Sequence, residues 1–312
     1  MEEKKAFYVD SHVHLSHGLY NGDFPFHRWD GKGFVREENG RREALIDRMK
    51  EQGIRFCVEP AVEPESNEQL LALAERYPGY VLPAVGIHPT RTWSYVLFDE
   101  HGKQQPKRLA WKSRAQIAAY AENPRVVAIG ETGLDFHQPR KEQHRLRQLA
   151  WFVWSLHLAH RKRLPVILHI READWLALVV LRLMKPFLHG GVCHCFNGTP
   201  RAAELYTSLG LKLGIGAALL AGGEQGKRLR RVVRQTRLED ILPETDGPFQ
   251  RPPCPEEESQ KRWRKARNTS LILPAVVNRI AYLKGRSPEE TARITGAAVM
   301  ELFGVPRESF EE

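Results

Sequence analysis

The sequence contains few cysteines and no long apolar run. Its 312 residues include four cysteines, whose ordinary spacing does not suggest a disulfide framework: Cys57, Cys193, Cys195 and Cys254. No apolar stretch approaches membrane-spanning length, and the short apolar run behind Met1–Lys5 lacks the core of a secretory signal. These absences exclude a disulfide-stapled secreted domain and a membrane protein. We therefore expect a cytoplasmic protein with no membrane partner.

The sequence also lacks low-complexity tracts and any evident linker between domains. Its apolar fraction of 42%, with charges of both signs, is typical of a chain that buries a large core. A chain of 312 residues could form two average domains, but α/β barrels of this length fold as one. We expect residues 1–312 to form a single domain, and we favour a monomer.

The net charge is +9 and the isoelectric point is about 9.4, which favours polyanionic partners such as nucleic acid without identifying one. Basic residues cluster in four segments: Arg140–Arg147, His160–Arg163, Lys227–Arg237 and Lys261–Arg267. A solvated helix face is the preferred interpretation of most of them.

Short apolar runs bounded by turn residues recur along the chain, and amphipathic segments of helical length lie between them. The predicted strands are Phe7–His14, Arg55–Val58, Val81–His88, Val126–Glu131, Pro165–His169, Gly191–Phe196, Leu211–Ala217 and Ile241–Asp246. The predicted helices include Arg42–Gln52, Glu65–Tyr77, Arg140–Lys162, Glu172–Met184, Glu224–Arg237, Leu271–Leu283 and Pro288–Leu302. Continuously apolar runs indicate parallel strands that are covered on both faces.

Eight such units predict an α/β fold of the (β/α)8 TIM-barrel type, whose chemistry lies at the C-terminal ends of the strands. An open doubly wound sheet is the rival fold. The absence of a Gly-rich phosphate loop after the first strand argues against its nucleotide-binding form.

Two connections, His17–Arg41 and Thr90–Lys112, are longer than barrel turns require. The first carries Tyr20, Phe24, Phe26, Trp29 and Phe34 around Asp30-Gly31, and the second carries Trp93, Tyr95, Phe98 and Trp111 around His101-Gly102. Each could form a hairpin-like cap whose aromatic side chains stack on nucleic-acid bases. Alternatively, these side chains only pack the loops together.

Candidate metal ligands fall at the ends of the predicted strands. His12 and His14 alternate along the first strand, so both point to the same side, where two imidazoles can bind one cation. Glu131 ends the fourth strand, and its two oxygens could bridge two metals. His169 and His194 end the next two strands and could hold the second ion.

The last strand ends in Glu244-Thr245-Asp246, in which both carboxylates share the inward face. Asp246 can bind the first metal and orient or deprotonate the attacking water, while Glu244 aligns a metal ligand. His88, after the third strand, could contact a substrate phosphate. Alternation along the strand sends Cys193 and Cys195 to the face opposite His194, where we expect buried structural thiols.

Six motifs occur in order along the chain: Asp-Ser-His-x-His at 10–14, Gly-Ile-His-Pro at 86–89, Gly-Glu-Thr-Gly-Leu-Asp at 130–135, Leu-Pro-Val-x-x-His-x-Arg-Glu-Ala at 164–173, His-Cys-Phe-x-Gly at 194–198 and Glu-Thr-Asp-x-Pro at 244–248. Together they resemble the TatD-like metal-dependent deoxyribonucleases of the amidohydrolase superfamily, from Val9 to about Gly304. The first connection is enlarged relative to that family.

The resemblance implies a TIM barrel that hydrolyses phosphodiester bonds of DNA, often as a 3′→5′ exonuclease on single strands. It implies two divalent metal ions, which could be Mg, Mn or Zn. His12, His14, Glu131 and Asp246 would hold one ion, and Glu131, His169 and His194 would hold the other.

The expected mechanism uses two ions to clamp the scissile phosphate and to lower the pKa of the attacking water. The candidate catalytic residues are Asp246, Glu131, His88 and Glu244, and the candidate substrate contacts are His88, Arg171, Lys261 and Arg264, with Trp263 as a stacking surface. RNA is a possible second substrate. The alternatives are cleavage of another ester or amide, such as aminoacyl-tRNA, or a noncatalytic nucleic-acid-binding subunit. The complete ligand set argues against the latter.

Overall fold

The computed structural model describes residues 7–94, 110–137 and 142–306. Eight strands form one parallel sheet: β1 (Tyr8–Asp10), β4 (Ile54–Pro60), β5 (Val81–Val85), β6 (Ala128–Asp135), β7 (Val166–Arg171), β8 (Gly191–Cys193), β9 (Leu211–Ile215) and β10 (Ile241–Pro243). The sheet closes where Ser11 N donates to Pro243 O at 3.0 Å and Val13 bridges Gly247. The predicted (β/α)8 barrel is confirmed.

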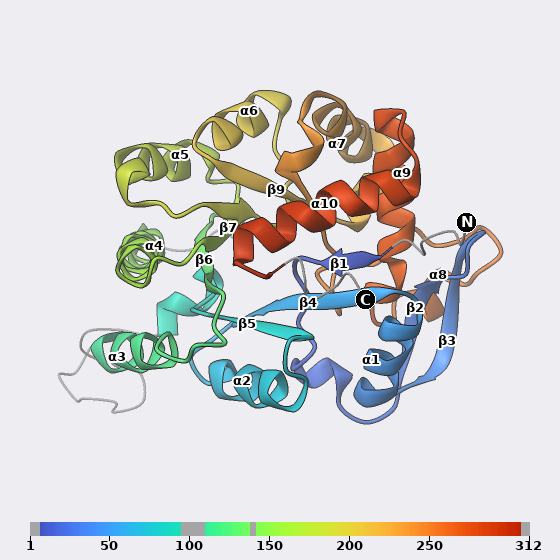
Figure 1. The fold of residues 1–312 in the computed structure, drawn as a ribbon, viewed down its shortest axis with the longest axis horizontal. Coiled ribbons are helices and arrows are strands. Elements are labelled where there is room, and N and C mark those ends of the chain that lie inside the picture. Colours follow the sequence, from blue (N-terminus) through green and yellow to red (C-terminus); the bar gives the residue numbers. More distant parts are fainter. Residues whose placement is uncertain (1–6, 95–109, 138–141, 307–312) are drawn as a thin grey trace.

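Helices surround the barrel (Figure 1): α1 (Arg42–Glu51), α2 (Ser66–Arg76), α3 (Ala110–Tyr120), α4 (Glu142–Lys162), α5 (Asp174–Leu183), α6 (Pro200–Ser208), α7 (Gly223–Gln235), α9 (Leu273–Lys284) and α10 (Pro288–Phe303). Local chemistry sets their ends. Ser287 caps α10 by accepting a hydrogen bond from Glu290 N, and Gly304 ends it with a φ of 67°. Among the described helices, none combines the length and apolar character needed to cross a membrane.

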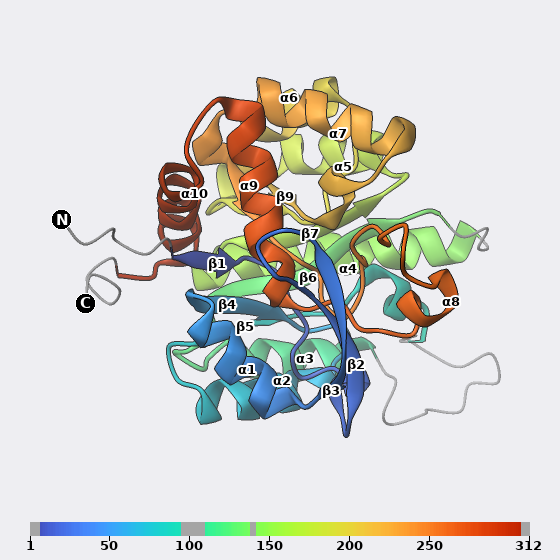
Figure 2. The same ribbon diagram turned by 90° about the vertical axis from the view of Figure 1, so that its right-hand side faces the viewer.

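Apolar side chains fill one end of the barrel. This cluster joins Val9, Phe56, Ala84, Ala128, Ile167, Val192 and Leu242 from the strands. Val299 and Phe303 of α10 belong to the same cluster, so α10 closes the end at which the strands begin. Figure 2 shows α10 at one end of the barrel and the short helix α8 (Gln260–Trp263) at the other. Polar side chains therefore converge at the open, C-terminal end of the strands.

The first long connection contains an antiparallel hairpin of β2 (Phe24–Trp29) and β3 (Phe34–Gly40), which turns at the predicted Asp30-Gly31. Backbone hydrogen bonds join the hairpin to the segment after β10, since Arg267 N donates to Pro25 O at 2.7 Å and His27 N donates to Arg267 O at 2.9 Å. The predicted hairpin is confirmed for the first connection.

The aromatic residues of this connection mostly pack it together. Tyr20, Phe24 and Phe26 are each 3% exposed or less, and Trp29 packs against Phe34 with 5.1 Å between ring centroids. The packing interpretation therefore holds for the buried three. Tyr95, Phe98 and His101-Gly102 of the second connection lie outside the described residues, whereas Trp93 and Trp111 at its ends are exposed.

Candidate metal centre

The six candidate ligands meet at the C-terminal mouth of the barrel. His12 and His14 follow β1, Glu131 lies in β6, His169 lies in β7, His194 follows β8 and Asp246 follows β10. The chain closes the barrel next to them, since Asp246 N donates to His12 O at 2.9 Å and His14 N donates to Gly247 O at 2.8 Å. Residues distant in the sequence are thus held by backbone hydrogen bonds.

One group of ligands, which we call the inner set, comprises His12, His14, Asp246 and Glu131 Oε2. The Nε2 atoms of His12 and His14 lie 3.2 Å apart. Asp246 Oδ1 lies 3.4 Å from His14 Nε2 and 3.7 Å from His12 Nε2. Glu131 Oε2 lies 3.7 Å and 4.0 Å from the same two nitrogens. Four potential metal-ligand atoms therefore face one small space.

These separations fit a metal ion. Ligand atoms at about 2.1 Å from one tetrahedral ion lie about 3.4 Å from each other. The imidazole of His14 also has the required tautomer, because its Nδ1 lies 3.1 Å from Pro60 O and donates to it, which leaves the Nε2 lone pair facing the set. The inner set can hold a metal ion.

A second group, the outer set, comprises His169, His194 and Glu131 Oε1. His194 Nε2 lies 2.7 Å from Glu131 Oε1, and His169 Nδ1 lies 2.9 Å from His194 Nε2 and 3.4 Å from Glu131 Oε1. His169 Nε2 lies 3.1 Å from Asp135 Oδ2 and donates to it, so Nδ1 is free to bind a metal. The two oxygens of Glu131 thus face different ligand sets.

The charges of the ligands balance each other. Burial opposes the charged form of Glu131, but the neighbouring histidines, His194 first, outweigh it and hold the pKa of this carboxyl well below its usual range. Burial alone would lower the pKa of His14 and His169. The neighbouring carboxylates outweigh this effect and raise the pKa of both to about 9. They are Asp246 and Glu131 beside His14, and Asp135 and Glu131 beside His169. Without a metal, each set retains one protonated imidazole near neutral pH.

His88 borders the outer set, but its tautomer differs from that of a metal ligand. Its Nε2 lies 3.8 Å from Glu131 Oε1. Thr90 N donates to His88 Nδ1 at 3.1 Å, so the ring proton of the neutral imidazole sits on Nε2 and faces the site. Burial, followed by the charge of His169, lowers the pKa of His88 to about 3, which keeps the ring neutral. In this tautomer His88 is a hydrogen-bond donor.

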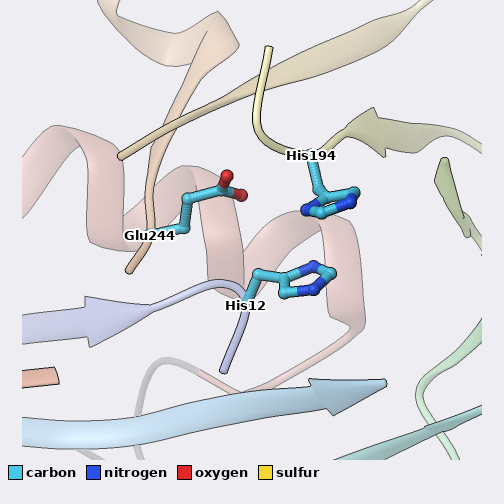
Figure 3. A group of neighbouring side chains, drawn as sticks. All are labelled: His12, His194 and Glu244. Carbon is cyan, nitrogen blue, oxygen red and sulfur yellow. The ribbon is translucent and has the colours of Figure 1, made fainter. Parts of the chain in front are cut away.

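Glu244 lies behind one histidine of each set (Figure 3). The rings of His12 and His194 stack with 3.9 Å between centroids, and the ligand atoms of His12, His194 and Glu244 lie within 4.8 Å of one another. Glu244 Oε2 and the Nδ1 atoms of both histidines are buried without a hydrogen-bond partner among the described residues. A Cβ at Gly214 would lie 2.1 Å from Glu244 Oε2, so glycine is needed there to make room.

Asp135 orients His169, a role that was not predicted from the sequence. A signal was present, because Glu131, Gly133 and Asp135 alternate along one strand and alternate residues share a face.

The prediction for Cys195 was wrong. Cys193 is buried among the residues between sheet and helices, as predicted. Strand β8 ends there, however, and Cys195 has a φ of 48°. Its thiol therefore faces the site and lies 3.6 Å from Asp246 Oδ2. Strict alternation failed because the backbone leaves the extended conformation at this point.

A pocket of about 730 Å³ adjoins the outer set and Asp246. His169, His194 and the candidate substrate contact Arg171 line it, as does Arg228 of α7. Arg228 Nη2 donates to Asn197 O at 2.9 Å, which fixes this cation in the wall. Arg228 was assigned only to a solvated helix face from the sequence.

The prediction for Trp263 was also wrong. This residue is 2% exposed, its Nε1 donates to Pro252 O at 2.9 Å, and its ring packs on His27. It therefore anchors the hairpin and cannot stack on a base. The candidate contacts Lys261 and Arg264 are exposed on the same segment but do not line the pocket.

The barrel and its converging histidines and carboxylates are typical of metal-dependent hydrolases. Residues 9–304 match the model of the family described as TatD related DNase. The chain therefore belongs to this family, and the predicted family and enzyme class are confirmed.

Individual relatives agree with this assignment. A protein of Erwinia billingiae named 3′-5′ ssDNA/RNA exonuclease TatD is 32% identical over 265 residues, which cover 85% of this chain and 94% of that protein. The crystal structure of a TatD homologue from Escherichia coli is 26% identical, with a TM-score of 0.72 over 96% of this chain and 98% of that one. A TatD family hydrolase from Entamoeba histolytica is 18% identical, with a TM-score of 0.74 over 97% of this chain and 100% of that one, which shows the shared fold.

Proposed function

We propose that this protein is a metal-dependent nuclease that hydrolyses phosphodiester bonds of single-stranded DNA, and also of RNA, from the 3′ end. One observation carries the proposal. Glu131 lies between the inner and outer sets, with Oε2 directed at His12 and His14 and Oε1 directed at His169 and His194. This is the arrangement of a carboxylate that bridges two ions, and the names of the relatives supply the substrate class.

We propose two divalent ions, Mg, Mn or Zn, one in each set. When bound, they polarise the phosphate and lower the pKa of the attacking water. Asp246 presents Oδ1 to the inner histidines, and Oδ2, which the Cys195 thiol also faces at 3.6 Å, would accept the proton of that water. Glu244 lies beside the rings of His12 and His194 and would restrict their orientation, and Asp135 accepts a hydrogen bond from His169 that orients its ring.

His88 serves the substrate in this proposal. A neutral imidazole with its proton on Nε2 can donate to a non-bridging oxygen of the scissile phosphate. A protonated imidazole at this position would compete with the metal ions for the carboxylate of Glu131. The low pKa of His88 therefore suits a donor that stays neutral throughout the working pH range.

The pocket beside the outer set receives the single-stranded nucleic acid. Its volume of about 730 Å³ is in the range of sites for a nucleotide-sized ligand, and Arg171 and Arg228 supply positive charge for adjoining phosphates. We propose that residues 1–312 act as one monomeric catalytic unit, because ligands come from both the first and the last strand of the barrel.

The proposal is tested by incubating the purified protein with single-stranded DNA or RNA and Mg²⁺ or Mn²⁺. Oligonucleotides labelled at the 5′ end should shorten one nucleotide at a time, whereas a 3′ label should be released at once. Glu131→Ala and Asp246→Ala should be inactive, and Glu301→Ala, which changes an exposed carboxylate of α10 at the opposite end of the barrel, should remain active. A wild-type protein that binds metal but leaves both substrates intact would refute the proposal.

A further inference from the structure

Phe249 is an exposed aromatic residue at the mouth of the metal centre. It is 40% exposed, whereas Tyr20, Phe24 and Phe26 of the nearby connection are each 3% exposed or less. Its backbone N donates to Asp246 O at 2.8 Å, so the turn that presents the Asp246 carboxylate also carries the ring. What sets Phe249 apart from the buried aromatics is that its accessible ring lies in ring contact with His14, a candidate metal ligand.

The ring of Phe249 is held beside the inner set. It meets the His14 ring in a T-shaped contact with 5.9 Å between centroids, and the His17 ring in another with 5.3 Å. His14 is itself fixed by its hydrogen bond to Pro60 O. The orientation of the Phe249 ring is therefore set by contacts on the protein side, while part of the side chain remains accessible.

The next residue, Gln250, lines the pocket that adjoins the outer set. Phe249 thus contacts a ligand of the inner set, and its neighbour in the chain belongs to the wall of that pocket. A phosphate placed at the metal centre has a base on each side, separated from it by one sugar. An aromatic face at this position is within reach of such a base.

We propose that Phe249 stacks on the base of a nucleotide that flanks the scissile phosphate. This inference rests on the proposed nuclease function and deepens it. Stacking uses the π-face that every base has, so it is tolerant of sequence and indifferent to the sugar. It also requires a base that is not already stacked and paired in a duplex. Phe249 would therefore favour single strands of either DNA or RNA.

The test compares wild-type protein with Phe249→Ala, Phe249→Leu and Phe249→Tyr. Substrates are a single-stranded oligonucleotide and matched versions with an abasic residue at either of the two 3′-terminal positions. On the normal strand we expect Phe249→Ala and Phe249→Leu to lose about 5- to 100-fold in kcat/KM, the range for loss of one stacked base, and Phe249→Tyr to retain activity. On one of the abasic strands all four proteins should be nearly equal.

A second readout does not depend on turnover. Metal-free wild type and Phe249→Tyr should quench the fluorescence of 2-aminopurine placed near the 3′ end, whereas Phe249→Ala and Phe249→Leu should not. Equal losses on normal and abasic strands, or quenching that survives Phe249→Ala, would overturn the inference. An inactive wild type would instead count against the nuclease function itself, so the two failures are distinguishable.

Discussion

The inner and outer sets use similar side chains but differ in burial and charge. The side chains of His12, His14 and Asp246 in the inner set are 0%, 5% and 10% exposed. In the outer set His194 is 3% exposed, but His169 is 17% exposed and makes this set the more accessible one. Two carboxylates face the inner set. Of the described carboxylates, Glu131 faces the outer set directly, whereas Asp135 accepts a hydrogen bond from His169 and acts through it.

This difference separates two tasks. A buried site with two negative charges and fixed imidazoles holds a cation tightly. A site whose two histidines line an open pocket leaves room for a substrate oxygen in the coordination sphere. We therefore expect an inner ion that is retained and an outer ion that exchanges and meets the scissile phosphate. The following predictions test this contrast.

Replacing Glu131 should weaken metal binding in the inner and the outer set alike, because this residue belongs to both sets. We expect Glu131→Gln to lower kcat/KM on single-stranded DNA by about 10³-fold or more. The amide has only one oxygen and no negative charge, so it cannot serve both sets as the carboxylate does. Elemental analysis should show loss of both ions. Glu301→Gln, on the exposed face of α10 at the opposite end of the barrel, is the matched control. Full metal content in Glu131→Gln would contradict the bridging role.

Asp246→Asn and His169→Gln should each weaken metal binding mainly in one of the two sets, the inner set and the outer set respectively. After dialysis against a weak chelator, we expect wild type and His169→Gln to retain one equivalent of metal, and Asp246→Asn to retain less. Activity should fall by about 10²- to 10³-fold in both variants, because hydrolysis uses both ions. In His169→Gln, added metal should restore part of the activity. If both variants lost metal equally, the proposed difference in affinity would be wrong.

The sequence predicted the barrel and the six side chains that meet at its mouth because periodicity and strand ends are local signals. Glu131, His169 and His194 each sit at the end of a recognisable apolar run, and a parallel barrel brings all such ends to one mouth. The hairpin was predictable for the same reason, since Asp30-Gly31 marks a turn between two strand-like runs.

Features that depend on a local change from extended backbone, or on packing between segments far apart in the sequence, were not predictable in this way. Cys195 faces Asp246 because the chain adopts a positive φ just after β8. Trp263 is buried because the hairpin, more than 200 residues earlier in the chain, packs on it. The tautomer of His88 follows from one hydrogen bond that Thr90 N donates to His88 Nδ1. None of these contacts has a periodic signature.

Asp135 offers a narrower test, because it supports only the outer set. We expect Asp135→Asn to weaken metal binding or activity by about 10- to 100-fold, as for other carboxylates that orient a ligating histidine. Calorimetry should show the loss at the weaker of the two binding events. Glu244→Gln is the informative counterpart, because Glu244 adjoins His12 and His194, and it should weaken both events. A loss confined to the tighter event in Asp135→Asn would contradict the assignment of ligands.

Changes in pH should act on both sets alike, since each contains one histidine whose pKa is about 9 in the metal-free protein. A pKa raised above the unfolded value stabilises the folded protein fully below pH 6.5, and this contribution is lost as the pH rises through 9. The free energy of unfolding of the metal-free protein should therefore fall over this range. Metal binding displaces these protons, so affinity should move the opposite way and rise by about tenfold between pH 7 and 8 for each proton displaced. Calorimetric titrations in buffers of different ionisation enthalpy count the protons released. An affinity that stays constant between pH 7 and 9 would mean that His14 and His169 are already neutral before the metal arrives.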